Sequence, residues 1–155
     1  MLAANVQPLD EETLAECAAK AREVDRQEAM LQTGRPLDEA MWRSYRMSTG
    51  CYAGRLDNDL VCVWGVAALA PLEGIGQPWL VATPMIDRAA FPFLRQCWYY
   101  LNKMKSDHDF LWNVVWEENT AACQWLSWMG FEMKQPRKVG PFNRNFIPFE
   151  WSANV

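Results

Sequence analysis

The chain has few of the residues from which metal sites and thiol nucleophiles are built. Its 155 residues include one histidine, His108, and five cysteines, none of which forms a C-x-x-C pair. A zinc site needs clustered Cys and His ligands, and a Cys–His catalytic pair needs a histidine beside the thiol. We therefore expect no metal site, and an odd number of unpaired cysteines favours a reducing compartment over a disulfide scaffold. His108, between two aspartates, is expected in a solvated turn.

Long apolar runs and excess positive charge are also lacking. No stretch approaches the roughly 20 apolar residues of a membrane helix, and the start of the chain lacks the basic and apolar parts of a signal peptide. The net charge is −4 and the pI is near 5.0, which argues against general binding to nucleic-acid phosphates. We expect no membrane insertion, no general nucleic-acid binding and a cytoplasmic location.

Hydrophobic and aromatic residues are plentiful. Half of the chain is hydrophobic, 22% is charged, and no repeat or linker interrupts it, which favours a single domain over residues 1–155. Nine tryptophans are more than one small core needs. Because exposed aromatic residues are enriched at interfaces, some of them are expected to bind a partner.

The first fifty residues predict two helices. Acidic residues begin the segment 10–24 and basic residues end it, which complements a helix dipole. Residues 32–35 look like a break, Pro36 suits the first turn of a second helix, and Gly50 is expected to end that helix.

The middle of the chain predicts a hairpin, a further strand and a helix. Aspartate and asparagine at 57–59 suit a turn, and Pro84 suits the end of a strand. Apolar residues then recur with a helical period. The expected ranges are strands 51–56 and 60–69, loop 70–78, strand 79–83 and helix 89–105.

The last third predicts a buried strand followed by a capped helix. The near-continuous apolar stretch 110–116 is typical of a strand that is buried on both faces. Asn119 can cap a helix over 120–129, and Gly130 can end it in the left-handed conformation. Two adjacent stripes of this helix are expected to pack on the sheet: Ala121, Trp125 and Trp128, and Ala122, Leu126 and Met129. Residues 131–134 and 146–151 are weaker strand candidates.

The order strand, Asn119, helix, Gly-Phe, strand resembles the second half of the GNAT fold, the fold of the GCN5-related N-acetyltransferases. The resemblance rests on 76–83, 111–116, Asn119-Thr120 and 125–131. It implies an α/β (α+β) protein with a mixed central sheet and helices on both faces. Strand 111–116 should then lie centrally, between 79–83 and one of the last two strands.

The same phrases resemble, more narrowly, small GNAT-like proteins of tailed bacteriophages, including the podophage internal virion (core-assembly) proteins. This resemblance implies a phage-encoded protein with a binding or virion-assembly role and a degenerate catalytic site. Its partner would be a phage structural protein or a host protein, and its location the host cytoplasm or the virion. The alternative is an acetyl-CoA-dependent N-acetyltransferase acting on a host or phage amine.

The GNAT resemblance also implies a place for acetyl-CoA if the protein is an enzyme, and no cofactor otherwise. A pantetheine-like group would lie near Val81, Thr83 and Asn119, and Arg88 would stand at the first position of the pyrophosphate-binding turn. That turn is glycine-rich in the family, whereas residues 84–93 contain no glycine. Since Asp87 would repel the anion and Pro92 lacks an N–H group, with Phe91 and Phe93 obstructing approach, coenzyme A is expected to bind weakly or not at all in the usual pose.

Acid–base residues are equally sparse. Many GNAT enzymes place a tyrosine four residues before the terminal glycine of this helix, and here that position is Leu126, which cannot donate a proton. The strand 79–83 contains no Glu or His. Glu117 and Glu118 could act through water or could simply complement the helix dipole, and Asn119 could contact pantetheine or serve only as a helix cap. No catalytic residue is assigned from the sequence.

Overall fold

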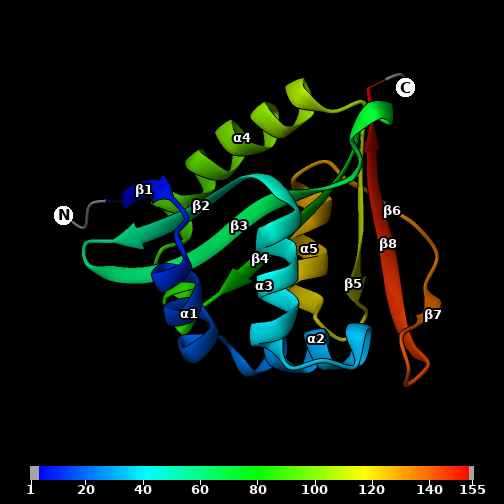
Figure 1. The fold of residues 1–155 in the computed structure, drawn as a ribbon, viewed down its shortest axis with the longest axis horizontal. Helices are drawn as coiled ribbons and strands as arrows, with labels where there is room; N and C mark the ends of the chain where they lie inside the picture. The colour runs from blue at the N-terminus through cyan, green and yellow to red at the C-terminus, as the bar shows by residue number, and fades with distance from the viewer. Residues whose placement is uncertain (1–3, 154–155) are drawn as a thin grey trace.

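The computed structural model describes residues 4–153, and of residues 90–94 it describes the backbone but not the side chains. Figure 1 shows helices arranged around one sheet. The elements follow in the order β1 (Ala4–Pro8), α1 (Glu11–Lys20), α2 (Glu23–Thr33), α3 (Leu37–Met47), β2 (Ser48–Leu56), β3 (Asp59–Ala70), η1 (Pro71–Glu73), β4 (Ile75–Ala82), η2 (Pro84–Asp87), α4 (Ala90–Asp107), β5 (Phe110–Trp116), α5 (Thr120–Trp128), β6 (Glu132–Met133), β7 (Arg137–Val139) and β8 (Arg144–Ser152).

The sheet is mixed and has the strand order β1-β2-β3-β4-β5-β8-β6, with β7 also paired to β8. Its strand pairs are antiparallel except for β4 and β5, which run parallel. The prediction that 111–116 forms a central strand is confirmed, because β5 lies between β4 and β8.

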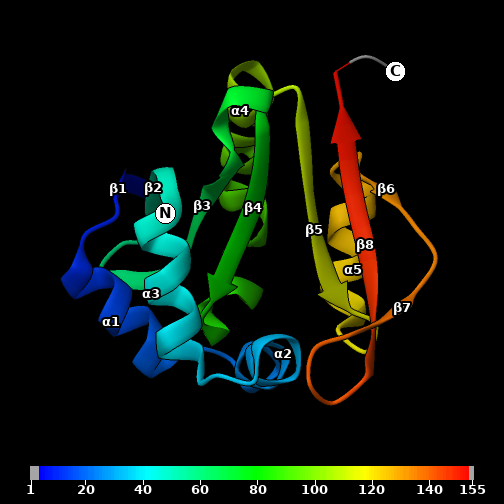
Figure 2. The ribbon, with the colours of Figure 1, turned by 45° about the vertical axis from the view of Figure 1, so that its right-hand side comes forward.

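Helices cover both faces of this sheet, as predicted (Figures 1 and 2). On one face, α1 and α3 pack through Leu14, Cys17 and Met41 onto Val63 and Val81. On the other face, α4 and α5 bury apolar residues against strands β3, β4, β5 and β8 in two adjoining clusters. The sheet is therefore the middle layer of three, which is the mixed α/β arrangement that lets a sheet bury both of its faces.

The expected helix over 10–24 is wrong in its C-terminal part, because the chain breaks after Lys20 and a new helix begins at Glu23. Tertiary hydrogen bonds stabilise the break. The Arg26 guanidinium donates to the carbonyl oxygens of Ala18 and Ala19, which the end of α1 leaves without helical partners. A sequence pattern does not reveal such contacts from outside the helix.

Two other boundaries also differ from expectation. Helix α3 ends at Met47 and not at Gly50, since β2 already begins at Ser48. Strand β4 begins at Ile75, inside the expected loop 70–78. Ile75 and Gly76 pair with both β3 and β5, and an added Cβ at Gly76 would come within 2.7 Å of a ring atom of His108. His108 is thus half-buried against β4 and not in a solvated turn, and its Nδ1 lies 2.9 Å from the Met104 carbonyl oxygen.

Helix α5 begins at Thr120, as predicted, and ends at Trp128, one residue before the predicted end. The Asn119 side chain accepts from Ala122 N–H, and Gly130 has a positive φ of 96°. One apolar stripe is confirmed, with Leu126 and Met129 buried. The other stripe is only partly right, because Trp125 packs against the core whereas Ala121 and Trp128 are exposed. Because α5 has only nine residues and lies on a twisted sheet, residues on its two flanks face solvent. Trp128 therefore packs on Trp98 of α4 and not on the sheet, with ring centroids 5.3 Å apart.

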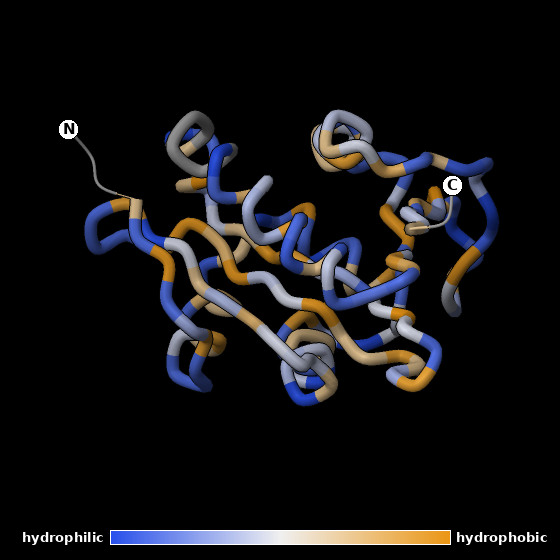
Figure 3. The backbone as a smooth tube through the Cα atoms, turned by 90° about the horizontal axis from the view of Figure 1, so that it is seen from above, coloured by the Kyte–Doolittle hydropathy of each residue, from blue (hydrophilic) through white to orange (hydrophobic). Residues whose placement is uncertain are grey.

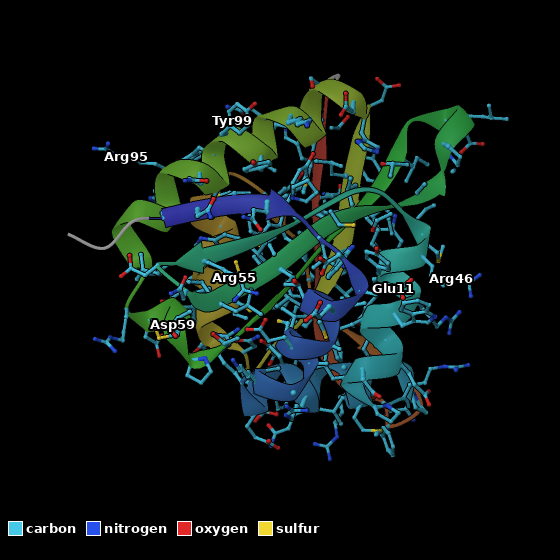
Figure 4. The ribbon with its side chains drawn as sticks, turned by 60° about the vertical axis from the view of Figure 1, so that its left-hand side comes forward. Glu11, Arg46, Arg55, Asp59, Arg95 and Tyr99 are labelled. Atoms are coloured by element: carbon cyan, nitrogen blue, oxygen red, sulfur yellow. The ribbon has the colours of Figure 1, made fainter. Side chains whose placement is uncertain are left out.

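Hydrophobic and hydrophilic segments alternate along the backbone of the helices, as one-sided burial requires (Figure 3). Within residues 4–153, no helix combines the length and the apolar character needed to cross a membrane. On the outer side of α4, Arg95 and Tyr99 point away from the sheet (Figure 4).

Candidate functional site

Strands β4 and β5 separate soon after they begin, and this separation creates the site. Only two residue pairs join them, Ile75 with Phe110 and Gly76 with Leu111. Figure 2 shows the two strands diverging toward their C-terminal ends, where α2 lies across the opening. Backbone groups that would pair in a regular sheet therefore face an open wedge.

Asn113 on β5 bridges the wedge near its narrow end. Its Nδ2 donates to the Pro78 carbonyl at 2.8 Å, and its Oδ1 accepts from Gln77 Nε2 at 3.2 Å and from Val114 N–H at 2.7 Å. One side chain thus replaces several ladder hydrogen bonds and holds the strands at a set separation.

Asp25 on α2 supplies a hydrogen-bond acceptor to the backbone of β4 at the wide end of the wedge. Its Oδ2 accepts from Ala82 N–H at 3.0 Å, and Arg22 N–H donates to the Ala82 carbonyl at 3.1 Å. Asp25 is buried and ion-paired to the Arg22 guanidinium, with Oδ1 and Nη2 3.0 Å apart. The charge is therefore neutralised locally, which a buried carboxylate requires.

Glu28, one helical turn further along α2, supplies a hydrogen-bond acceptor to the backbone of β5. Its Oε1 accepts from Trp116 N–H at 2.6 Å. Burial raises the pKa of the Glu28 carboxyl to about 7, and the nearby Asp25 adds to the rise, while the hydrogen bonds from Trp116 and Asn119 lower it in part. A carboxyl that titrates near neutral pH can accept or donate a proton under physiological conditions.

A cavity of about 620 Å³ passes through the wedge and reaches both faces of the sheet. This volume lies within the range of about 300–1,000 Å³ that is common for small-molecule sites. Glu28, Gln32 and Arg43 line it on the α2–α3 face, and Tyr100 and Trp125 line it on the α4–α5 face. Two molecules could therefore meet inside the wedge from opposite sides.

Leu80 presents free backbone groups to this cavity. Thr83 N–H donates to the Val61 carbonyl of β3. In an antiparallel pair, every second residue directs its backbone N–H and C=O toward the partner strand, so the residues between them direct theirs toward β5. Leu80 belongs to the set that faces β5, and within the described chain its N–H and C=O have no hydrogen-bond partner there. They offer one donor and one acceptor to a ligand.

The four residues that the resemblance assigned to a cofactor lie in three different settings. Val81 is buried and packs against α1 and α3. Thr83 is buried, donating through Oγ1 to the Leu60 carbonyl, and Arg88 is exposed. Val81 and Asn119 are both buried and both line the cavity, and Asn119 lies beside Glu28. Its role as a helix cap is confirmed, and contact of any of the four with a cofactor stays a prediction.

The turn that should hold a pyrophosphate has several of its N–H groups already bonded before α4 begins. Met85 N–H bonds to Thr83 Oγ1, Ile86 N–H to the Thr83 carbonyl and Arg88 N–H to the Met85 carbonyl, so these donors are already used. Pyrophosphate binding at a helix start depends on unsatisfied N–H groups. The expected obstruction by Phe91 and Phe93 concerns side chains outside those that the structure describes.

The acid–base candidates also differ from expectation. Glu117 and Glu118 are exposed and do not line the cavity, and Leu126 is buried as a packing residue. Tyr100 lines the cavity, and burial raises the pKa of its hydroxyl. Cys17 and Cys97 are packing residues whose thiols have pKa values raised by burial to about 12. No group of three or more His, Cys, Asp and Glu side chains that could hold a metal occurs among residues 4–153, leaving aside the undescribed side chains of 90–94.

Sequence reasoning missed Asp25, Glu28 and Asn113. A signal for Glu28 was present, because Val24 and Leu31 lie four residues before and three after it and mark the inward face of α2. A glutamate between them places a carboxylate on the face that packs against the protein. The partners of that carboxylate lie 88 residues away, at Trp116, and no local pattern indicates them.

Comparisons with known proteins agree with this geometry at the level of the fold. No family model matches the chain, and no curated protein shows a significant match. Solved structures similar to it at low identity include the following three. A protein of Acinetobacter baylyi ADP1 provisionally assigned to the acetyltransferases is 12% identical with a TM-score of 0.73, covering 100% of this chain and 96% of its own. A GNAT-family acetyltransferase of Streptococcus pneumoniae is 12% identical with a TM-score of 0.65 (97% and 99% covered). Spermidine N-acetyltransferase of Vibrio cholerae, solved with CoA and spermine, is 8% identical with a TM-score of 0.69 (96% and 95% covered).

The likeness to the Acinetobacter protein covers 100% of this chain, so the segments that form β4 and β5 are included in it. At identities this low, the structural similarity establishes a shared fold and nothing more, because function depends on the residues of the site. The protein therefore has the GNAT fold, the fold of the GCN5-related N-acetyltransferases.

Proposed function

We propose that the protein is an N-acyltransferase, which transfers an acetyl-type group from a thioester to an amine inside the wedge between β4 and β5. The observation that carries this proposal is Glu28, a carboxyl with a pKa near 7 inside a cavity open to both faces of the sheet. Support also comes from the fold, which this chain shares with acetyltransferases such as the spermidine enzyme.

Each step has a residue suited to it. The amine enters from the α2–α3 face, and its nitrogen becomes acidic as it bonds to the thioester carbonyl carbon. Glu28 accepts one proton from that nitrogen, the carbon–sulfur bond breaks, and the Tyr100 hydroxyl gives a proton to the leaving sulfur. The Leu80 N–H and C=O orient the amide-containing arm of the thioester. Water then returns the proton from Glu28 to Tyr100.

The test is acyl transfer to a panel of primary amines, with the acylated amine detected by mass. Detection of released thiol is unsuitable because the chain has five free cysteines. Glu28→Gln should lower kcat/KM by about 10²–10⁴-fold. The matched control, Glu23→Gln, changes an exposed glutamate of the same helix and should keep full activity. Equal activity of the Glu28→Gln variant would exclude this role.

A second candidate is the phage-encoded binding or virion-assembly protein that the narrower resemblance implies. It is favoured by the occupied donors of the turn 83–88 and by exposed aromatic residues on α4 and α5, namely Trp98, Tyr99 and Trp128. Such residues are typical anchors for a protein partner. Under this proposal the wedge is a structural remnant and the partner is a phage structural protein or a host protein.

This candidate predicts no transfer from any thioester and recovery of the protein in purified virions of the phage that encodes it. Simultaneous replacement of Trp98 and Trp128 by alanine should then prevent its incorporation, while Glu28→Gln should not. The opposite pattern, with turnover that depends on Glu28 and no recovery in virions, favours the acyltransferase.

A further inference from the structure

The site treats the two halves of a coenzyme A thioester differently. A pantetheine-type arm is an uncharged chain with amide groups, and the wedge offers it the free N–H and C=O of Leu80. The cavity wall beside it on the α4–α5 face is apolar and includes Cys97, Leu101, Met104 and Leu126. This half of the site matches the arm in both polarity and hydrogen bonding.

The nucleotide half finds fewer hydrogen-bond donors. The N–H groups of Met85, Ile86, Arg88 and Ala89 are bonded within the turn, and Pro84 has none. The third residue of helix α4 is again a proline, so the first turn of this helix also has one N–H group fewer. A diphosphate would therefore find fewer free N–H groups here than at a helix start that has no proline and no bonded turn before it.

Charges at this end of the cavity also oppose a diphosphate. Asp87 lines the cavity, whereas Arg88 is exposed and lies outside the lining. The basic residues of α4 face elsewhere: Arg95 points away from the sheet (Figure 4), and Lys103 donates to the Tyr52 hydroxyl at 2.8 Å. Lys105 lies over the Trp151 ring, with Nζ 5.2 Å from its centroid.

We propose that the acyl donor is a thioester of a pantetheine-type arm that lacks the phosphorylated adenosine of coenzyme A. This inference rests on the proposed acyltransferase function and names its donor class. The transfer is balanced as described above: the amine nitrogen gains the acyl carbon, and the arm leaves as a free thiol. The arm could be a small molecule or could be presented by a carrier protein, and both sources share the same chemistry.

Binding separates this inference from the proposed function, because it is measured without turnover. Titrations of the wild-type protein with acetyl-pantetheine and with acetyl-CoA, followed by calorimetry, should give a dissociation constant at least about tenfold lower for acetyl-pantetheine, equivalent to about 1.4 kcal/mol. The adenosine 3′,5′-bisphosphate portion alone should not compete. Equal or tighter binding of acetyl-CoA, or competition by that portion, would overturn the inference.

Two variants test the physical reason. Asp87→Asn should tighten acetyl-CoA binding several-fold and leave acetyl-pantetheine unchanged, because only the diphosphate is repelled. The control Asp107→Asn, at the far exposed end of α4, should change neither. If Asp87→Asn affects both ligands alike, the charge does not discriminate between them and the argument from Asp87 fails.

Transfer assays then distinguish a free arm from a carrier-bound arm. They also separate the donor class from the acyltransferase function on which it rests. Faster transfer from an acetylated carrier protein supports a tethered arm, and equal or faster transfer from acetyl-pantetheine supports a free one. Transfer that prefers acetyl-CoA overturns the donor class and leaves the acyltransferase function in place. Absence of transfer from every thioester overturns the acyltransferase function itself.

Discussion

At the scale of single residues, the wedge is held by polar side chains that replace missing strand pairs. Glu28 and Asp25, on consecutive turns of α2, accept from the backbone of β5 and β4 respectively. Their environments differ, since Asp25 has the Arg22 guanidinium beside it whereas Glu28 has the neutral groups of Trp116 and Asn119. Two carboxylates in unlike surroundings can take unlike roles, one structural and one chemical.

Glu28 predicts a pH-dependent stability. Its pKa is about 7 in the folded protein against an ordinary value of 4.5, so the native state binds this proton more tightly than the unfolded chain. The resulting stabilisation is complete below the ordinary value and is lost as pH rises through about 7. Relative to Glu28→Gln, the wild-type free energy of unfolding should fall by on the order of 2–3 kcal/mol across this window. Urea titrations at several pH values measure it, and a difference that does not vary with pH would contradict it.

Replacement of Asp25 is expected to cause a large loss of stability. Asp25→Ala leaves the Arg22 guanidinium and the Ala82 N–H without their partner, which should cost about 3–5 kcal/mol of unfolding free energy. Gln27→Ala, at an exposed position of the same helix, should stay within about 0.5 kcal/mol of wild type. Comparable urea midpoints for the two variants would show that Asp25 does not contribute this stabilisation.

At the scale of elements, short helices act as connectors between the sheet and the site. Helix α5 begins at Asn119, whose side chain caps the helix and also interacts with Glu28. Helix α2 begins where α1 ends, and its first turn is tied to the end of β4. The positions of these helix starts therefore determine where the carboxylates meet the backbone of the wedge.

Asn119→Ala tests this connection through two measurements. Loss of the cap should lower the unfolding free energy by about 1–2 kcal/mol. Because the Asn119 hydrogen bond lowers the pKa of Glu28, its removal should also shift the pH dependence of stability toward higher pH. Asn102→Ala, exposed on α4, is the control and should change neither quantity. A lower stability with an unchanged pH profile would assign Asn119 to capping alone.

At the scale of the whole molecule, two sheet halves are joined by few backbone bonds. Strands β1 to β4 form one half and β5, β6, β7 and β8 the other, with two residue pairs between them. Side chains supply the remaining connection, through the Asn113 bridge and through Val66 and Leu101, which pack with the β5–β8 core. A core that crosses the divide favours one cooperative unit.

This arrangement predicts a single unfolding transition. Far-ultraviolet circular dichroism and tryptophan fluorescence should give the same urea midpoint, because neither half keeps a complete core without the other. Asn113→Ala should lower that midpoint while the two signals still coincide. Separate midpoints for the two signals would indicate two independently folding halves and would contradict the prediction of one domain over residues 1–155.

The sequence by itself determined the elements whose signals are local. Asn119 and Gly130 define α5 because capping and left-handed φ are properties of single residues, and the apolar stretch of β5 predicts burial on both faces wherever the strand lies. Together these elements indicated the fold. The extent of β4 was less accessible, since Ile75 and Gly76 pair with both β3 and β5, and Gly76 lies against His108, 32 positions along the chain.

Only the tertiary structure decided the site. Glu28 has a pKa near 7 because α2 inserts it between two diverging strands, beside Trp116 and Asn119, which lie more than eighty residues away. Desolvation and hydrogen bonding depend on what surrounds a group in space, and the sequence near Glu28 contains none of its partners. Sequence reasoning therefore identified the fold and the helix cap Asn119, and it overlooked the two carboxylates, Asp25 and Glu28, that line the wedge.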